Sequence, residues 1–272
     1  MENIRKAIER AKARSGGSVG TRQPPPRIDP RHTPEFIPTT APYISEVELD
    51  RAHLVANRII AHGQPTRLSR PFDMLRTQVL QAMDAKNYRV VGITSPTPSC
   101  GKTVTAINLA LNIARQLERS VTLVDLDLQK PRVASTLGVG DCASVSDVLL
   151  GRATLSEGTL YGCIDSQRLA LLPAKETFGS SELLASSATA AFFQDLRHAF
   201  PSSTIIIDLP PILSTDEVIS VLPHLDCAIL VAAVGQTKLS EIEDCTHHLK
   251  GTDVLRVVVN KTTDPQSSYY YY

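Results

Sequence analysis

Short apolar runs alternate with segments of helical spacing from residue 88 onward. The runs are continuous and rich in valine, isoleucine and leucine, as strands are when helices cover both faces of a parallel sheet. The pattern therefore predicts an α/β fold, a doubly wound and mostly parallel sheet flanked by helices. We expect strands near residues 89–94, 121–126, 168–172, 204–208, 226–233 and 254–259, and helices near residues 102–118, 144–150, 181–200, 214–222 and 238–249.

Two more helices are predicted before the first strand. One covers residues 48–61 and ends before Gly63. The other begins after Ser69, a good N-cap, with Pro71 in its first turn. Its apolar stripe is expected to face inward and consists of Phe72, Leu75, Val79 and Met83.

The ends of the chain differ from this middle part. Residues 1–14 predict a short basic helix, which is either a solvated terminal helix or an element that docks on a partner or a membrane surface. Prolines and small polar residues then predict a disordered linker. The expected organisation is a basic helix at 1–14, a Pro-rich linker at 15–43, a folded domain at 44–264 and a flexible tyrosine-rich tail at 265–272.

Charge and composition exclude several functions. The 28 Lys and Arg residues balance 28 Asp and Glu residues, so a basic nucleic-acid surface is not indicated. No apolar run approaches the ~20 residues that cross a bilayer, and no signal peptide opens the chain. The five cysteines are odd in number and lack metal-ligand spacing. We expect a cytoplasmic protein with no membrane span and no nucleic-acid partner.

Residues 94–103 form the motif around which the chain is organised. The stretch follows a predicted strand, ends in Gly101-Lys102-Thr103 and opens a predicted helix, which is the context of a phosphate-binding P-loop. Pro96 stands where the consensus has its first glycine. In such a loop Lys102 would lie along the β- and γ-phosphates of ATP, and the Thr103 hydroxyl would bind Mg²⁺.

Carboxylates follow two of the other predicted strands. Asp125 and Asp127 end one strand, and Asp208 ends another. The carboxyl ends of parallel strands beside a P-loop are where the metal of a nucleotide is held. The alternative is that these residues only cap turns before Pro131 and Pro210.

Three segments resemble the Walker A, Walker A′ and Walker B motifs of bacterial tyrosine kinases, the autokinases of capsule and exopolysaccharide synthesis. The segments are residues 95–103, 124–131 and 207–211. The chain looks most similar to the stand-alone form associated with exosortase and PEP-CTERM gene clusters. Departures from the family pattern are Ser99 and Cys100 in place of Gly-Glu, Gln129 in place of Arg, and Arg70, Asp73 and Arg76 at the self-association motif Glu-x-x-Arg-x-x-Arg.

The resemblance implies roles for individual residues. Asp125 would act as the base for the incoming hydroxyl, Asp127 would lie near Mg²⁺, and Asp208 would reach Mg²⁺ through water. Asn260 would contact the adenine, or else it only ends a strand in a turn. Cys100 is either a redox-sensitive thiol or a passive substitution. The loop residues expected to bind nucleotide are Pro98, Ser99, Cys100, Gly101, Lys102, Thr103 and Val104, and the expected catalytic residues are Lys102, Asp125 and Asp127.

The resemblance also suggests an acceptor and partners. The terminal cluster of tyrosines would accept phosphate, with transfer between subunits of a homo-oligomer. The expected partner is a cytoplasmic segment of a membrane protein that controls polysaccharide chain length, which would recruit the kinase to the inner face of the membrane. The acceptor residues are Tyr269, Tyr270, Tyr271 and Tyr272.

Two other functions compete with an ATP-dependent tyrosine autokinase. One is an ATPase switch of the kind that positions division septa or plasmids. Such switches carry a lysine five residues before the P-loop lysine, whereas this chain has Thr97. The other is a regulatory scaffold in which Ser99 and Cys100 have weakened catalysis.

Overall fold

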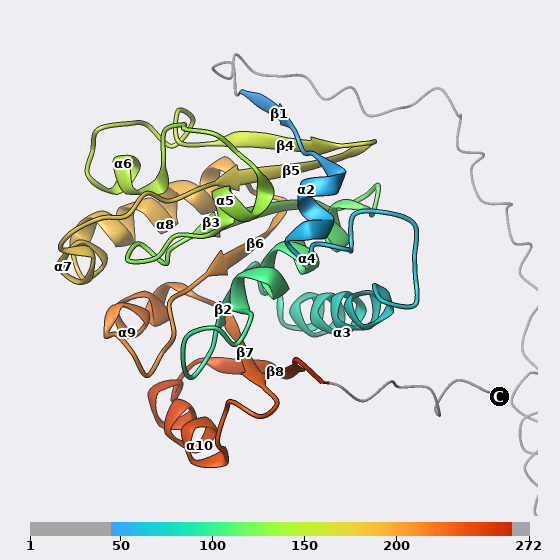
Figure 1. Cartoon of the computed structure of the whole chain (residues 1–272). Helices are drawn as coiled ribbons and strands as arrows, with labels where there is room; N and C mark the ends of the chain where they lie inside the picture. Colours follow the sequence, from blue (N-terminus) through green and yellow to red (C-terminus); the bar gives the residue numbers. More distant parts are fainter. Residues whose placement is uncertain (1–44, 263–272) are drawn as a thin grey trace, which may run out of the picture. The chain divides into compact units, whose positions relative to one another are not determined.

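The computed structural model describes residues 45–262, which fold into an eight-stranded sheet with helices on both faces (Figure 1). The strand order is β1-β4-β5-β3-β6-β2-β7-β8, and every neighbouring pair is parallel except β4 with β5. The predicted doubly wound, mostly parallel α/β fold is therefore confirmed. The strands are β1 Glu46–Glu48, β2 Val90–Thr94, β3 Ser120–Asp125, β4 Leu160–Ile164, β5 Gln167–Leu172, β6 Ser203–Asp208, β7 Cys227–Ala233 and β8 Asp253–Asn260.

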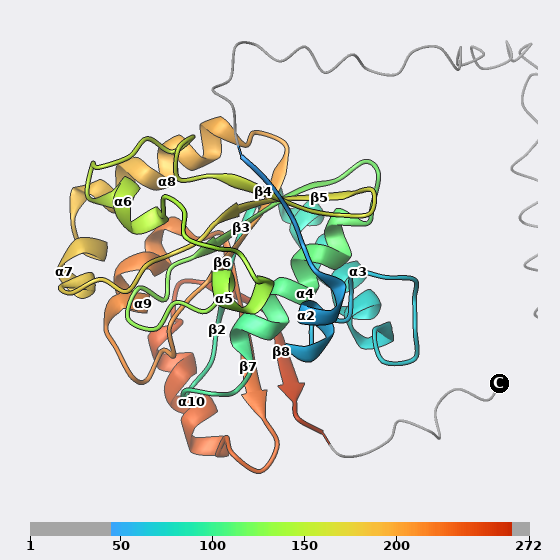
Figure 2. The same ribbon diagram turned by 45° about the horizontal axis from the view of Figure 1, so that its top comes forward.

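Two hydrophobic cores lie on opposite faces of the sheet, because successive strand residues point to opposite sides. On β6, Ile206 packs into the core beneath α4, whereas Ile205 and Ile207 pack into the core beneath α8. Figure 2 shows these two helices separated by the strands. The helices are α2 Arg51–Ala56, α3 Arg70–Lys86, α4 Lys102–Ala114, α5 Val133–Leu137, α6 Val145–Leu149, α7 Ser180–Leu184, α8 Ser187–Ala199, α9 Glu217–Val221 with the 3₁₀ turn Leu222–His224, and α10 Leu239–His248.

Three of the predicted helices are wrong in extent. The one predicted over 102–118 is α4, which ends at Ala114. The residues predicted as one helix over 48–61 begin with the last residue of β1, and the helical part is α2 alone. Asp50 fixes its start by accepting a hydrogen bond from the His53 N–H at 2.6 Å, and Arg58 has a φ of +63° soon after its end. The helix predicted over 181–200 is two helices, because Ser186 caps α8 by accepting from the Ala188 N–H.

Three elements were not predicted from the sequence, and one of them is the short edge strand β1. α5 is a single short turn of helix, and β4 pairs with β5 as an antiparallel hairpin. In β4 the alternate residues Leu160, Gly162 and Ile164 are buried, which is the period-two signal of a half-buried strand. The predicted basic helix, the Pro-rich linker and the tyrosine-rich tail lie outside the described residues. No helix among residues 45–262 has the length and apolarity that crossing a membrane requires.

Candidate active site

The predicted phosphate loop joins the carboxyl end of β2 to the amino end of α4. The helix begins at Lys102, directly after Gly101, and the Gly101 carbonyl accepts the Thr105 N–H at 2.9 Å. The free N–H groups of this first turn and the positive end of the helix dipole suit an anion. This end of α4 is therefore built as a phosphate site.

Gly101 is needed for two reasons. Its φ of +97° lies in the left-handed region, and a Cβ at this position would lie 2.1 Å from Asn260 Nδ2. Asn260 ends β8 and donates to the Cys100 carbonyl at 2.9 Å. The structure therefore brings Asn260 against the phosphate loop, where it fastens β8 to the loop backbone.

The residue before Cys100 is held in a conformation that favours glycine. Ser99 is exposed with a φ of +64°, a conformation that glycine adopts without strain, and glycine is the residue that the family pattern expects at this position. Cys100 is fully buried, and its Sγ lies 3.6 Å from Thr97 Oγ1 and 3.6 Å from Thr237 Oγ1. Solvent does not reach this thiol. Val104 is half-buried in the first turn of α4.

Four predicted site residues converge at the carboxyl ends of β3 and β6. Lys102 Nζ donates to Asp127 Oδ2 at 2.6 Å and lies 3.8 Å from Asp208 Oδ1. The Thr103 hydroxyl donates to Asp208 Oδ2 at 2.6 Å. All four residues are buried, so the ammonium and carboxylate groups interact with little screening by water.

The electrostatics of this cluster favour an added cation. Burial alone would lower the pKa of Lys102, but the carboxylates of Asp208 and Asp127 outweigh it and hold that pKa above its ordinary value. Burial raises the pKa of Asp208, although Lys102 and the Thr103 hydroxyl partly oppose the increase. Burial, with Asp208 as the next cause, also raises the pKa of Asp125. Negative charge here is incompletely neutralised.

One carboxylate oxygen of the cluster indicates that Mg²⁺ with a bound nucleotide fits this site. Asp208 Oδ1 is buried and has no hydrogen-bond partner, which is a costly state for a carboxylate oxygen. Carboxylate and hydroxyl oxygens are the ligands that Mg²⁺ prefers. Thr103, Asp127 and Asp208 could therefore hold a metal ion bound to phosphates.

Asp125 is placed differently from Asp127. Its Oδ1 accepts the Asp127 N–H at 3.1 Å, and its Oδ2 accepts the N–H groups of Arg132 and Val133, each at 3.0 Å. The side chain is fully buried. Asp125 thus holds the loop after β3 in place and caps the amino end of α5.

A fourth buried carboxylate, which the sequence analysis missed, lies beside the loop after β3. Glu217 is fully buried, and its Oε1 accepts Gln129 Nε2 at 3.0 Å and also the Ser180 hydroxyl. Its Oε2 has no partner. The contact joins the loop that follows Asp127 to the segment that follows Asp208. A glutamate at the start of a short helix gives no local signal of such a contact.

The connection between β7 and α10 contributes a further residue that sequence reasoning missed. Gln236, in the turn after β7, donates to the Pro98 carbonyl at 2.6 Å, and Lys261 Nζ donates to Gln236 Oε1 at 3.1 Å. The phosphate loop is thus held from the side by residues far away in the sequence.

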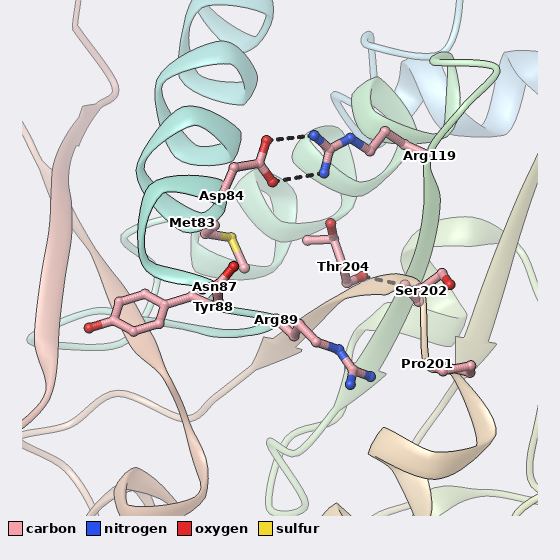
Figure 3. A pocket seen from close by; sticks show the side chains of 10 residues that line it. Met83, Asp84, Asn87, Tyr88, Arg89, Arg119, Pro201, Ser202 and Thr204 are labelled. Atoms are coloured by element: carbon pink, nitrogen blue, oxygen red, sulfur yellow. Dashed lines mark hydrogen bonds and ion pairs between the residues drawn. The ribbon is translucent and has the colours of Figure 1, made fainter.

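Two pockets lie at opposite ends of the strands. One, of about 490 Å³, is next to the site and is lined by Gln129, Lys130 and the residues from Glu176 to Glu182, including the fully exposed Phe178. The other, of about 450 Å³, opens at the amino ends of β2 and β6 (Figure 3). Asp84 and Arg119 face each other there through two hydrogen bonds of 2.9 Å and 2.5 Å. It is remote from the phosphate loop. The predicted acceptors Tyr269 to Tyr272 are outside the described residues.

A strand, a phosphate loop, a helix and converging carboxylates define a P-loop nucleotide-binding protein. The chain belongs to the CobQ/CobB/MinD/ParA nucleotide-binding domain family, whose model matches residues 91–270. The matched residues include the loop before α4 and the strand ends that carry Asp127 and Asp208.

Similar proteins carry kinase and polysaccharide-export names. The chain is 26% identical to the tyrosine-protein kinase YwqD of Bacillus subtilis (strain 168), over 82% of this chain and 94% of YwqD. It is 27% identical to the succinoglycan biosynthesis transport protein ExoP of Rhizobium meliloti (strain 1021), over 76% of this chain and 26% of ExoP. The crystal structure of the VpsO kinase domain matches with a TM-score of 0.64 and 27% identity, over 72% of this chain and 96% of that domain.

These comparisons confirm the resemblance to bacterial tyrosine kinases. The chain spans about a quarter of the length of the first curated relatives that it matches, and nearly the whole of YwqD.

Proposed function

We propose that this protein is an ATP-dependent protein-tyrosine kinase of exopolysaccharide or capsule synthesis. The observation that carries the proposal is the buried cluster of Lys102, Thr103, Asp127 and Asp208 at the end of the phosphate loop. The names of YwqD and ExoP support the activity and its setting. Phosphoryl transfer needs positioning and charge neutralisation, and this cluster can supply both.

Lys102 and the two carboxylates around it are proposed to change partners when ATP binds. Lys102 would leave Asp127 and lie along the β- and γ-phosphates. Thr103, Asp127 and Asp208 would hold Mg²⁺, with Asp208 acting through water. Bound Mg²⁺ would neutralise charge on the β- and γ-phosphate oxygens. Loop residues 98–104 would donate N–H groups to the phosphates, and Asn260 would contact the adenine.

We propose that one of two carboxylates, Asp125 or Asp127, is the base that takes the proton of the acceptor hydroxyl. The family resemblance points to Asp125, and its raised pKa suits a group that takes up a proton. Its three backbone partners instead suit a structural role, and Asp127 is the carboxylate that Lys102 would release. We retain Asp125 as the proposed base. In the reaction the bond from the γ-phosphorus to the bridging oxygen breaks, a bond to the tyrosine oxygen forms, and the phenolic proton passes to the base.

Tyr269, Tyr270, Tyr271 and Tyr272 are the proposed acceptors, with transfer between subunits of a homo-oligomer. Each phosphate would add about −1.5 to −2 charges at pH 7. We propose that the unphosphorylated tail docks at the site of a neighbouring subunit and that phosphorylation releases it. Sedimentation of the wild type, of a variant with all four residues changed to Phe, and of a phosphorylated sample tests this. Equal masses in all three samples would refute control of assembly by the tail.

We further propose recruitment by a cytoplasmic segment of a membrane protein that controls polysaccharide chain length. The contact candidates are the basic segment 1–14 and α3. Titrating a synthetic peptide of such a segment into the full chain, while following phosphotyrosine formation, tests this partner. Activation lost on removal of residues 1–14 would identify the basic segment as the contact, and unchanged activity at every peptide concentration would count against the partner.

One assay separates the candidate functions. Purified full-length protein is incubated with Mg-ATP, and both phosphotyrosine and released phosphate are measured. Phosphotyrosine identifies the kinase. Released phosphate without phosphotyrosine identifies an ATPase switch, and neither product identifies a scaffold. The Lys102→Met variant provides the background in each measurement.

A further inference from the structure

The two edges of the sheet are built very differently. β1, at one edge, has three residues, and two of them are exposed glutamates. Short length and charge are the usual protection of an edge strand against pairing with another chain. β8, at the other edge, has eight residues, contains no proline, and carries charge only at Asp253 and Arg256. Among the described residues, β8 pairs with β7 alone.

The second half of β8 also exposes apolar side chains. Val257 is 48% exposed and Val259 is 58% exposed, and both lie on the face of the sheet that carries α10. Val234, which is 50% exposed, donates its N–H to the Asn260 carbonyl and extends this apolar surface. An irregularity in the pairing with β7 separates the regular part, Arg256 to Asn260, from the start of the strand.

Two α3 residues at the position of the expected self-association motif make their contacts within this chain. Asp73 accepts from Asn112 Nδ2 at 2.9 Å and from Arg115 Nη1 at 3.2 Å. Arg76 Nη1 donates to Asn112 Oδ1 at 2.8 Å. Both side chains therefore tie α3 to α4. If this chain forms a homo-oligomer, we expect its subunits to meet through a different surface.

We propose that β8 pairs with β8 of a second copy in antiparallel orientation, with Val257 opposite Val259 of the partner. The segment Arg256 to Asn260 is self-complementary about Val258. In this register the exposed valines of both copies meet on one face, and each Arg256 faces an Asn260, so that no like charges are opposed. A second copy would supply hydrogen-bond partners for the free backbone groups of β8 and would also cover its exposed valines.

The interface would communicate with the nucleotide site. Asn260, at the end of the pairing segment, donates to the Cys100 carbonyl in the phosphate loop at 2.9 Å. Ordering β8 by pairing would therefore steady the loop that receives phosphate. The inference deepens the proposed homo-oligomer, but it does not depend on kinase activity, since the mass of the protein can be measured without ATP.

The first test is the concentration dependence of mass. Sedimentation equilibrium of the full-length protein without nucleotide should show the mass rising from one chain toward two with increasing concentration. Val257→Lys should abolish the increase by placing charge on the edge. Leu117→Lys, at a fully exposed residue after α4, is the matched control and should leave the increase intact. A wild-type mass that stays constant, or equal loss in both variants, would overturn the proposal.

The second test determines the register in which the two β8 strands pair. Mixing Val257→Cys chains with Val259→Cys chains under mild oxidation should give disulfide-linked dimers, whereas either variant alone should give several-fold fewer. Wild type and Leu117→Cys give the background from the native cysteines. Hydrogen exchange of β8 amides should slow as protein concentration rises. Slow exchange at every concentration would show that another part of the same chain covers the edge, which would refute pairing between copies.

Discussion

Lys102 is a buried cation that depends on carboxylates from two different strand ends. Its Nζ lies 2.6 Å from Asp127 Oδ2 and 3.8 Å from Asp208 Oδ1. A buried charge persists only where partners compensate for its lost hydration. The same group can exchange these carboxylates for phosphates, because both are anionic oxygens.

Lys102→Met should reduce turnover of ATP by roughly a hundredfold or more, since a charge-assisted contact in a preorganised site is removed. Calorimetric titration of Mg-ATP, next to a turnover assay, checks both binding and rate. Lys130→Met is the control, because that side chain is exposed beside the site. Wild-type turnover in Lys102→Met would refute the assignment of the site.

Asp125→Asn and Asp208→Asn should separate chemistry from metal binding. Loss of Asp208 should weaken the dependence of ATP binding on Mg²⁺, because its unpartnered oxygen is the proposed contact through water. Loss of the proposed base Asp125 should reduce transfer while leaving Mg-ATP affinity largely intact. Titrations and transfer assays on both variants, with Asp127→Asn as a third, decide the roles. If Asp127→Asn rather than Asp125→Asn lost transfer at full affinity, Asp127 would be the base.

Ser99→Gly should raise nucleotide affinity. A non-glycine residue at a φ of +64° costs about 1–2 kcal/mol, and glycine adopts this conformation without that cost. Gly101→Ala should have the opposite effect, because its Cβ would lie 2.1 Å from Asn260 Nδ2. Dissociation constants for Mg-ATP measure both changes. An unchanged constant in Ser99→Gly would show that the loop tolerates serine, and the scaffold hypothesis would lose its main support.

At the scale of elements, the carboxylate of Asp226 connects β2, β7 and α8. Its Oδ2 accepts the N–H groups of Arg89 and Val90 at 2.7 Å and 2.8 Å, and its Oδ1 accepts Arg197 Nη2 at 2.9 Å. The contacts fasten the start of β2 to the start of β7 and to α8. Burial alone would raise the pKa of Asp226, but Arg197 and the two N–H groups outweigh it and lower that pKa.

Asp226→Asn should lower the free energy of unfolding at pH 7 by about 2 kcal/mol, as expected for hydrogen bonds to a charged group. Because the folded-state pKa is lowered, this stabilisation is present above the unfolded pKa of about 3.9 and is lost as pH falls through the folded value. Urea unfolding at pH 7, 5 and 3 should therefore show the difference from wild type shrinking at the lowest pH. Asp195→Asn, exposed on α8, should show little difference at any of these values.

One pocket is lined by Gln129, Lys130 and residues 176–182 and lies beside the loop that follows Asp125 and Asp127, and we propose that a tyrosine acceptor approaches the site through it. Phe178→Ala should raise KM for a tyrosine peptide about two- to tenfold, the effect of losing an aromatic contact worth about 0.5–1.5 kcal/mol. We expect kcat and KM for ATP to stay unchanged. Leu117→Ala removes an equally exposed apolar side chain far from the site and is the control. A change in KM for ATP would point instead to an effect on the nucleotide site.

At the scale of the whole molecule, the parallel sheet decides where chemistry can occur. The carboxyl ends of the central strands β2, β3 and β6 lie at the same end of the sheet. The phosphate loop, Asp127 and Asp208 therefore meet there, although they are far apart in sequence. The pocket at the amino ends of β2 and β6 holds an internally satisfied ion pair, Asp84 with Arg119. In the proposed dimer the edge strand β8 would link this architecture to assembly, because its last residue, Asn260, donates to the phosphate loop.

The sequence by itself determined the parts that depend on local patterns. Continuous apolar runs predicted β2, β3, β5, β6, β7 and β8 within a residue or two. In β2, β3, β6 and β7 the run reflects burial on both faces of the sheet, which needs apolar side chains at nearly every position. In the edge strand β8 the run persists although Val257 and Val259 are exposed. Gly101-Lys102-Thr103 predicted the phosphate loop, because a positive φ and a helix start are properties of adjacent residues. The positions of Asp127 and Asp208 followed from strand direction alone.

Only the tertiary structure decided the contacts between residues distant in sequence. Asn260 reaches the Cys100 carbonyl across 160 residues, and Gln129 reaches Glu217 across 88. Such contacts depend on how loops close over the sheet, and no periodicity encodes that closure. The same holds for Asp125, whose partners are backbone N–H groups that become available only when the chain turns back at Arg132. Sequence spacing placed its carboxylate at the site, and the fold alone set its hydrogen bonds.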